Sequence, residues 1–311
     1  MSAITPSLPY ATDAVARRSA TDRIARAKTV VMFRVCIYFT VAVIACLVMV
    51  TTYLAGKGTA SLHLTESLSW TAPFARVPDF FARTPTFDRN DPGGMKHAIV
   101  GTLVLIGLAS AVGIPLGLLT GIYLAEYDRN AWLVAPVRFV ADVLAGVPSI
   151  VVGILGYELL VVPLGSRSGW AGAAALAFIM VPIAARTTEE MLRLVPNSYR
   201  EASIALGASK ARTIVSVVLP AATGSVVTGI MLAIARVAGE TAPLLFTAGI
   251  SRHMTTNPSE PFPSLTVQIS DFAADPAPQI RELAWGGILV LITLIFAINL
   301  TIRFVTRPKV R

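Results

Sequence analysis

The stretch AIVGTLVLIGLASAVGIPLGLLTGIYLA, residues 98–125, carries no charged side chain. About 20 mainly apolar residues are enough for an α-helix to cross the hydrocarbon core of a membrane. This stretch therefore predicts a transmembrane helix, and the composition of the whole chain agrees with it. Hydrophobic residues make up 54% of the 311 residues and charged residues 14%, whereas a soluble domain carries about 25% charged residues. We expect a protein that is embedded in a membrane.

Six apolar runs predict an all-α, polytopic membrane bundle of six transmembrane helices. The fourth run is short, so we expect it to tilt little or to lie inside the bundle. The first run exceeds the h-region of a signal peptide and no small-x-small cleavage site follows it, so we interpret it as a retained helix. The runs are residues 30–54, 98–125, 131–156, 170–185, 213–247 and 283–302.

The basic residues are distributed unevenly between the two sides of these spans. Of the 26 Lys and Arg residues, 17 lie on the side of the chain termini and eight on the other, with Arg236 inside the fifth span. Because basic loops stay in the cytoplasm, both termini are expected to be cytoplasmic. We interpret the net charge of +8 as a consequence of this topology and of attraction to an anionic lipid bilayer. Nothing in the pattern suggests nucleic acid.

The topology divides the chain into a leader and a membrane domain. The polar, basic residues 1–29 are expected to form a cytoplasmic leader, and residues 30–311 the transmembrane domain. Two long outer loops follow from the span boundaries, at residues 55–97 and 249–282.

Motifs for catalysis, nucleotide binding and metal binding are missing from the sequence. It contains no GxxxxGK[ST], HExxH or CxxC motif. Its three histidines, His63, His97 and His253, lie far apart in the predicted outer segments, so solvated surface histidines are expected rather than a metal site. No pair of carboxylates and no set of nucleophile and base stands out. We expect no cofactor, no metal and no enzymatic activity.

Small residues recur at helical spacing in the second apolar run. Gly113, Gly117 and Gly121 are four residues apart, and small residues at this period let two membrane helices approach closely. We favour helix packing, within the chain or against another subunit, over a role in ligand binding.

Prolines interrupt or border several of the apolar runs. Each removes a backbone hydrogen-bond donor, and membrane helices tolerate such breaks where they line protein or water. A transporter or a channel therefore fits better than a passive anchor. The prolines concerned are Pro115, Pro136, Pro148, Pro163 and Pro182.

The predicted cytoplasmic loop between the fourth and fifth spans reads PNSYREASIALGASKARTIVSVVLP, residues 196–220. Ser198 and Glu201 have the spacing of a capping box, and Gly207 can end a helix in the left-handed conformation. A short helix and a turn before the fifth span are expected. Exposed Ile204 and Leu206 would suit a groove on a cytoplasmic partner.

This loop resembles the EAA loop of the inner-membrane subunits of bacterial ABC importers. Ser203 replaces the usual alanine and Val217 the usual isoleucine, which are mild departures. The resemblance implies that the loop, residues 196–220, couples the membrane domain to an ATPase. The matching residues are Glu201, Ala202, Ser203, Gly207, Val217, Leu219 and Pro220.

Three further stretches resemble the PstA-type permeases of bacterial phosphate importers: GVPSIVVG (146–153), PIAARTTEEMLRLVP (182–196) and ARVAGETAPLLFTAG (235–249). The resemblance runs from about residue 98 to the end. It implies the type I ABC importer permease fold, a bacterial inner-membrane location and ATP-driven transport of inorganic phosphate. It also implies a partner permease of the PstC type, two ATPase subunits of the PstB type and an external phosphate-binding protein of the PstS type.

Other functions stay open at this point. A permease of the same superfamily could carry sulfate or molybdate, and a channel or secondary transporter could act alone. A membrane sensor or scaffold is a further alternative, although the EAA loop disfavours the last two. Co-purification with a nucleotide-binding partner separates an ABC permease from a self-sufficient carrier.

Two charges occur inside the fifth predicted span, within AIARVAGETAPLLF (233–246). On one helix Arg236 and Glu240 would share a face, so they could pair merely to fix the span in register. Alternatively, Arg236 faces the translocation path and offers its planar donor fork to phosphate, and Glu240 holds it when the path is empty. The resemblance supports a pathway role for this pair, and Thr241 follows it directly.

Overall fold

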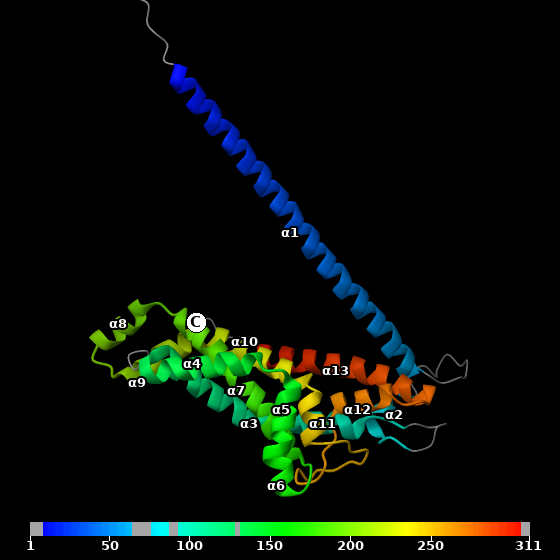
Figure 1. Cartoon of the computed structure of the whole chain (residues 1–311). Coiled ribbons are helices and arrows are strands. Elements are labelled where there is room, and N and C mark those ends of the chain that lie inside the picture. Colours follow the sequence, from blue (N-terminus) through cyan, green and yellow to red (C-terminus); the bar gives the residue numbers. More distant parts are fainter. Residues whose placement is uncertain (1–8, 64–75, 87–92, 128–130, 306–311) are drawn as a thin grey trace, which may run out of the picture. The chain divides into compact units, whose positions relative to one another are not determined.

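The computed structural model describes residues 9–63, 76–86, 93–127 and 131–305. These residues are helical apart from connecting loops and one isolated β-bridge, so the predicted all-α class is confirmed. Five helices are long and apolar enough to span a membrane, or six if the bent pair α4–α5 counts as one span. The helices are α1 (Pro9–His63), α2 (Arg76–Ala82), α3 (Lys96–Glu126), α4 (Ala131–Gly146), α5 (Ser149–Gly156), α6 (Val162–Leu164), α7 (Gly169–Arg193), α8 (Asn197–Ala205), α9 (Lys210–Thr213), α10 (Leu219–Ala238), α11 (Ala242–Thr247), α12 (Leu265–Ala273) and α13 (Pro278–Val305) (Figure 1).

The chain divides into two compact units, Met1–Gly56 and Lys57–Arg311. In the first unit, α1 begins at Pro9, so no helix boundary separates most of the expected leader from the first expected span. None of the most apolar part of α1 is buried. A helix that is apolar all round and uncovered suits a lipid environment.

The second unit is built around the close pair α3 and α7. A Cβ at Gly117 would lie 2.5 Å from Ala184 Cβ, and a Cβ at Gly121 would lie 2.6 Å from the Ala185 carbonyl oxygen. Gly113 lies against Met180 in the same way. The absence of these side chains lets the two backbones approach.

Helix α7 is more buried than the other candidate spans, since 67% of its most apolar window lies inside the protein. The expectation that the fourth span lies inside the bundle is therefore confirmed. Its predicted end at residue 185 is wrong, because α7 continues to Arg193. The charged residues that marked that end in the sequence form ion pairs alongside the helix.

Replacing Gly117 should loosen the pairing of α3 and α7. Gly117→Ala is expected to destabilise the protein by about 1–3 kcal/mol, because the added methyl group overpacks a close contact. Gly107→Ala is the matched control on the same helix, since a Cβ there meets nothing within 4 Å. Thermal unfolding in detergent should show a lower Tm for Gly117→Ala only. Equal Tm values for the two variants would contradict this packing account.

Two predicted spans are interrupted. The span expected at 131–156 bends by 102° between α4 and α5, because the residue before Pro148 is disfavoured in helical conformation. The span expected at 213–247 stops at Ala238 and resumes as α11. Gly239 follows the last helical residue, and Pro243 cannot donate a backbone hydrogen bond to the preceding turn. The break beside Pro148 agrees with the expectation that prolines interrupt the apolar runs, whereas the expectation of one helix through Arg236 and Glu240 is wrong.

Two π-helical turns precede prolines that remain within helical segments. They comprise Tyr157–Val161, before Pro163, and Ile214–Val218, before Pro220. The amide of Leu219 donates to the carbonyl of Ile214, five residues back. A widened turn relieves the clash between a proline ring and the preceding turn. These turns let the chain continue into α6 and α10.

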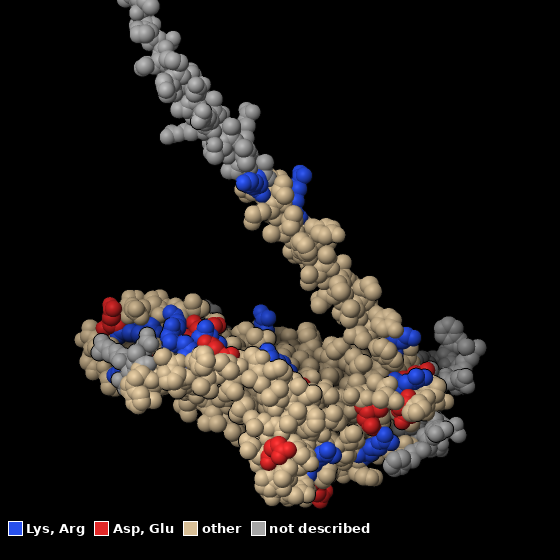
Figure 2. Space-filling model, viewed as in Figure 1, with Lys and Arg blue, Asp and Glu red and all other residues tan. Residues whose placement is uncertain are grey.

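Charged side chains gather towards the ends of the second unit. Figure 2 shows them near α8 and α9, near α6 and near α12, whereas the rest of the visible surface carries few. The described part of this unit contains three apolar core clusters, which include Phe272 of α12, Leu176 of α7 and Leu192 in the last turn of α7. This distribution fits a bundle that crosses a bilayer from end to end.

Candidate functional site

The two interrupted spans meet in the middle of the bundle. Figure 1 shows α5 beside α11, and a Cβ at Gly153 would lie 2.9 Å from Pro243 Cα. Gly156 lies against Thr247 in the same way. Non-helical backbone at membrane depth is tolerated only where it is buried in protein or lines water. The junction of these breaks is therefore the candidate transport site.

Arg236, Glu240 and Thr241 lie together at this junction. Arg236 is in the last turn of α10 with an exposed side chain, Glu240 follows the helix, and Thr241 immediately precedes α11. The expected pairing on one helical face is not formed, because α10 ends between the two charges. Among the described residues, no ion pair includes Arg236.

A segment of the second predicted outer loop holds the backbone at this break. Thr266 Oγ1 donates to the carbonyl oxygen of Glu240 at 2.9 Å. The neighbouring Leu265 amide donates to Thr102 Oγ1 of α3 at 2.7 Å, and Pro263 lies where a Cβ of Gly101 would be. The segment is thus fixed to α3 and to the α10–α11 break at once.

The residues of the EAA-like loop lie at the far end of the bundle, on α8 and the turn after it. Gly207 has a φ of +84°, and its amide donates to the carbonyl of Ile204 at 2.9 Å. Ile204 and Leu206 are 56% and 89% exposed. Glu201 and Ala202 are exposed on the same short helix, whereas Leu219 and Pro220 begin α10. The loop thus presents an apolar, solvent-facing edge.

The expected capping box at Ser198 and Glu201 is wrong. Helix α8 begins at Asn197, its N-cap is Pro196, and no side chain caps it. Pro196 sets the entry into the helix by its fixed φ, so the serine lies inside the first turn instead. Ser203 makes a different contact, because its hydroxyl lies 2.9 Å from Thr213 Oγ1 of α9.

A buried carboxylate that sequence reasoning missed joins α4 to the end of α7. Glu189 is 1% exposed and forms ion pairs with Arg138 of α4 at 2.8 Å, with Arg193 at 3.0 Å and with Arg186 at 3.4 Å. Several cations around one carboxylate satisfy its charge in a partly buried place. The sequence signal was the cluster of charges in PIAARTTEEMLRLVP, a stretch that supported the resemblance to the permeases but whose ion pairs were not foreseen.

Arg200 is a second functional candidate that sequence reasoning missed. Its guanidinium forms an ion pair with Glu126 at 2.6 Å, and the carboxylate is 6% exposed. Arg200 lies directly before the EAA-like motif, and Glu126 is the one acidic residue that ends a long apolar helix. These two positions were the sequence signal from which the ion pair could have been inferred.

The histidines do not all lie where the sequence placed them. His253 is exposed, as expected, but His97 is fully buried, and its Nε2 lies 3.2 Å from Gln268 Oε1. The prediction of a solvated His97 is therefore wrong, because the second outer segment folds over the start of α3. The side chain of His63 lies outside the described residues. Within the described part of the chain, no group of His, Cys, Asp or Glu could hold a metal ion.

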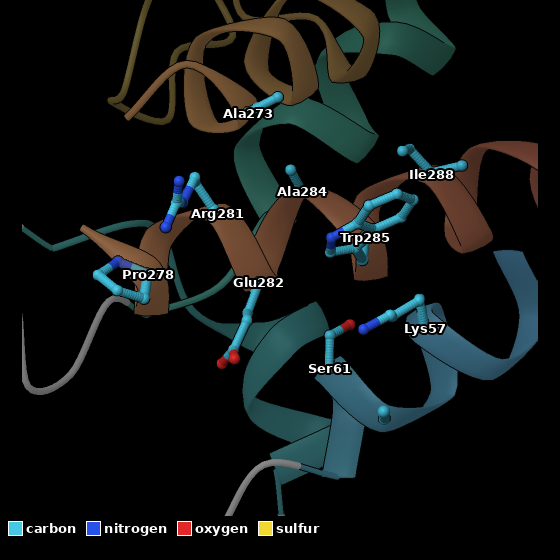
Figure 3. A pocket seen from close by; sticks show the side chains of 10 residues that line it. Lys57, Ser61, Ala273, Pro278, Arg281, Glu282, Ala284, Trp285 and Ile288 are labelled. Atoms are coloured by element: carbon cyan, nitrogen blue, oxygen red, sulfur yellow. The ribbon is translucent and has the colours of Figure 1, made fainter. Parts of the chain in front are cut away.

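The second unit also contains a pocket of about 500 Å³ beside α13, lined by residues that include Lys57, Ser61 and Trp285. Figure 3 shows Lys57 and Ser61 on the last turns of α1, facing Trp285 of α13. None of the site residues expected from the sequence lines this pocket.

Comparisons with known proteins agree on one family. Residues 113–309 match the family described as the binding-protein-dependent transport system inner membrane component. The phosphate transport system permease protein PstA of Yersinia pestis is 46% identical over 217 residues, which cover 70% of this chain and 74% of that protein. The protein of the same name from Haemophilus influenzae is 41% identical, covering 76% of this chain and 83% of its own length.

Solved structures share the fold at low sequence identity. A bacterial ABC transporter involved in the import of the acidic polysaccharide alginate matches with a TM-score of 0.62 and 13% identity, covering 87% of this chain and 93% of that chain. The methionine ABC transporter MetNI, in an inward-facing conformation, matches with a TM-score of 0.54 and 19% identity, covering 69% and 94%. The membrane fold is therefore that of ABC importer permeases.

Proposed function

The chain belongs to the family of binding-protein-dependent transport system inner membrane components, and from this membership we propose that it is the transmembrane subunit of an ATP-driven phosphate importer. The observation that supports phosphate as the substrate is the 46% identity to a phosphate permease. It is tested by ATP-driven uptake of labelled phosphate into vesicles that contain the assembled complex. ATP hydrolysis is assigned to a separate subunit.

The α10–α11 break is proposed as this subunit's part of the translocation pathway. An exposed arginine with no ion pair among the described residues stands there beside Glu240 and Thr241. A guanidinium presents two parallel N–H groups that match the oxygens of phosphate. Glu240 follows on the non-helical backbone, where its charge would repel a second anion; among the described residues, the expected hold of Glu240 on Arg236 is not formed.

The family and the exposed residues of α8 support the proposed partners. Helix α8, with its exposed Ile204 and Leu206, fits a helix-in-groove contact with an ATPase subunit of the PstB type, of which the complex would hold two. A partner permease of the PstC type would supply the other half of the pathway. An external phosphate-binding protein of the PstS type would deliver the substrate.

The proposed orientation places both termini and α8 in the cytoplasm, and a labelling experiment tests it. Cys36 and Cys46 are exposed, so both are first replaced by alanine. An impermeant thiol reagent added to intact cells should then label Thr86→Cys and Thr256→Cys but not Ser198→Cys, which should react only after the membrane is opened. Labelling of Ser198→Cys in intact cells would overturn the orientation and the cytoplasmic coupling role.

A further inference from the structure

One arginine fastens the coupling helix to the central pair of helices. Arg200 of α8 donates from Nη2 to Glu126 Oε1 at 2.6 Å and from Nε to both carboxylate oxygens at 3.1 and 3.2 Å. Glu126 is the last residue of α3. The side chains of the arginine and the glutamate are 18% and 6% exposed. The fork of a guanidinium on a carboxylate fixes direction as well as distance.

The same guanidinium also binds the end of α7. Its Nη2 donates to the carbonyl of Leu192 at 2.9 Å, and its Nη1 donates to the carbonyl of Val195 at 2.6 Å. Leu192 is in the last turn of α7, and Val195, which follows that end, donates its amide to the Leu192 carbonyl at 3.2 Å. Arg200 therefore joins α8 to the ends of α3 and α7 together.

The rest of α8 has few attachments to the bundle. Glu201, Ala202, Ile204 and Leu206 are exposed. Among the described residues, the other side-chain hydrogen bond from α8 to another element joins Ser203 to Thr213 of α9, which is part of the same hairpin. The hairpin also contacts the end of α3 through Lys210 of α9, whose Nζ lies 4.3 Å from the centre of the Tyr127 ring. Arg200 is the residue that links α8 itself directly to α3 and α7.

We propose that Arg200 is a positioning residue for energy coupling, because its ion pair with Glu126 makes α8 move together with α3 and α7 when an ATPase displaces α8. This inference rests on the proposed function. Helices α3 and α7 are packed closely at Gly117 and Gly121, so they can transmit a displacement as one body. The far end of α3 binds the segment that holds the Glu240 carbonyl, through Thr102 and Leu265.

The burial and the hydrogen-bond geometry of the Arg200–Glu126 pair determine which substitutions it can tolerate. Because Glu126 is almost fully buried, removing the arginine leaves a charge without its partner. Lysine would keep the charge but could not bind the carboxylate and two carbonyls with one planar group. Neutralising both residues removes the unpaired charge but does not restore the link.

The experiment compares Arg200→Gln, Glu126→Gln and the double variant in the complete complex, reconstituted with its ATPase and binding protein. Phosphate moved per ATP hydrolysed should fall at least about tenfold in each single variant, within the usual range of coupling between sites. The double variant should be no worse than either single one, since the two residues act through one contact. Arg303→Gln, which removes an exposed arginine from α13, should keep the wild-type ratio.

Hydrogen exchange of the α8 amides supplies a readout that does not depend on the substrate. The amides of α8 should exchange faster in both single variants while those of α7 stay protected. Unchanged α8 exchange, or an unchanged ratio of phosphate to ATP, would overturn the proposal. A purely structural role would lower the amount of assembled complex and leave that ratio intact, which would also overturn it. Failure of the proposed function itself would show as absent uptake by the wild-type complex.

Discussion

Arg236→Gln is expected to reduce ATP-driven phosphate uptake by about tenfold to a hundredfold, because a hydrogen bond to a charged group is worth roughly 1.5–3 kcal/mol. Arg236→Lys should also cut transport strongly, since it keeps the charge but loses the planar fork. Both variants should assemble, because the Arg236 side chain is exposed and forms no ion pair among the described residues. The measurement is the initial rate of phosphate uptake per amount of complex.

Arg303→Gln is the matched control for Arg236. It removes one positive charge from an exposed position of α13, away from the helix break. Its uptake should equal that of the wild-type protein, which separates a local effect from one of net charge. Normal phosphate uptake by Arg236→Gln would make the arginine structural and remove the pathway assignment.

Gly207→Val should uncouple ATP hydrolysis from transport while the membrane subunits still insert. Gly207 has a φ of +84°, and a β-branched residue there costs about 1–2 kcal/mol, which depopulates the native turn by about fivefold to thirtyfold. A Cβ at this position meets nothing within 4 Å, so the effect comes from the backbone and not from packing. The ratio of phosphate transported to ATP hydrolysed measures it.

Gly207→Asn is the matched control, because asparagine tolerates the left-handed conformation. It should retain most of the coupling that valine loses.

Glu201→Lys, on the exposed face of α8, should also uncouple ATP hydrolysis from transport, because it reverses a charge at the ATPase contact. Normal ATP-driven uptake in both Gly207→Val and Glu201→Lys would contradict the coupling role of this loop.

The sequence was sufficient for the class and the approximate spans, because apolar runs long enough to cross a membrane leave a strong signal. It also located the turn at Gly207, because a glycine that follows a short helical segment favours the left-handed backbone conformation that ends a helix. The break between α10 and α11 was missed for a physical reason. A long apolar run with two charges inside it fits one helix as well as two, and only the backbone geometry at Gly239 separates them.

The polar contacts could not be read from one sequence because they join distant segments. Glu126 and Arg200 are far apart in the chain, and only the packing of α3 against α7 brings their helices to one end. The burial of His97 depends in the same way on a segment that folds back from beyond residue 249. Charges at the end of α7 suggested a helix end, but Glu189 and Arg193 pair along it and let the helix continue.

Transport into reconstituted vesicles tests whether this chain carries phosphate in an ATP-driven complex. The complex is reconstituted in vesicles with its ATPase and binding protein, and uptake of labelled phosphate is followed with ATP, without ATP, and with excess unlabelled sulfate. The account predicts uptake that requires ATP and persists in the presence of sulfate. Uptake of labelled sulfate in place of phosphate, or phosphate uptake that needs no ATP, would contradict it.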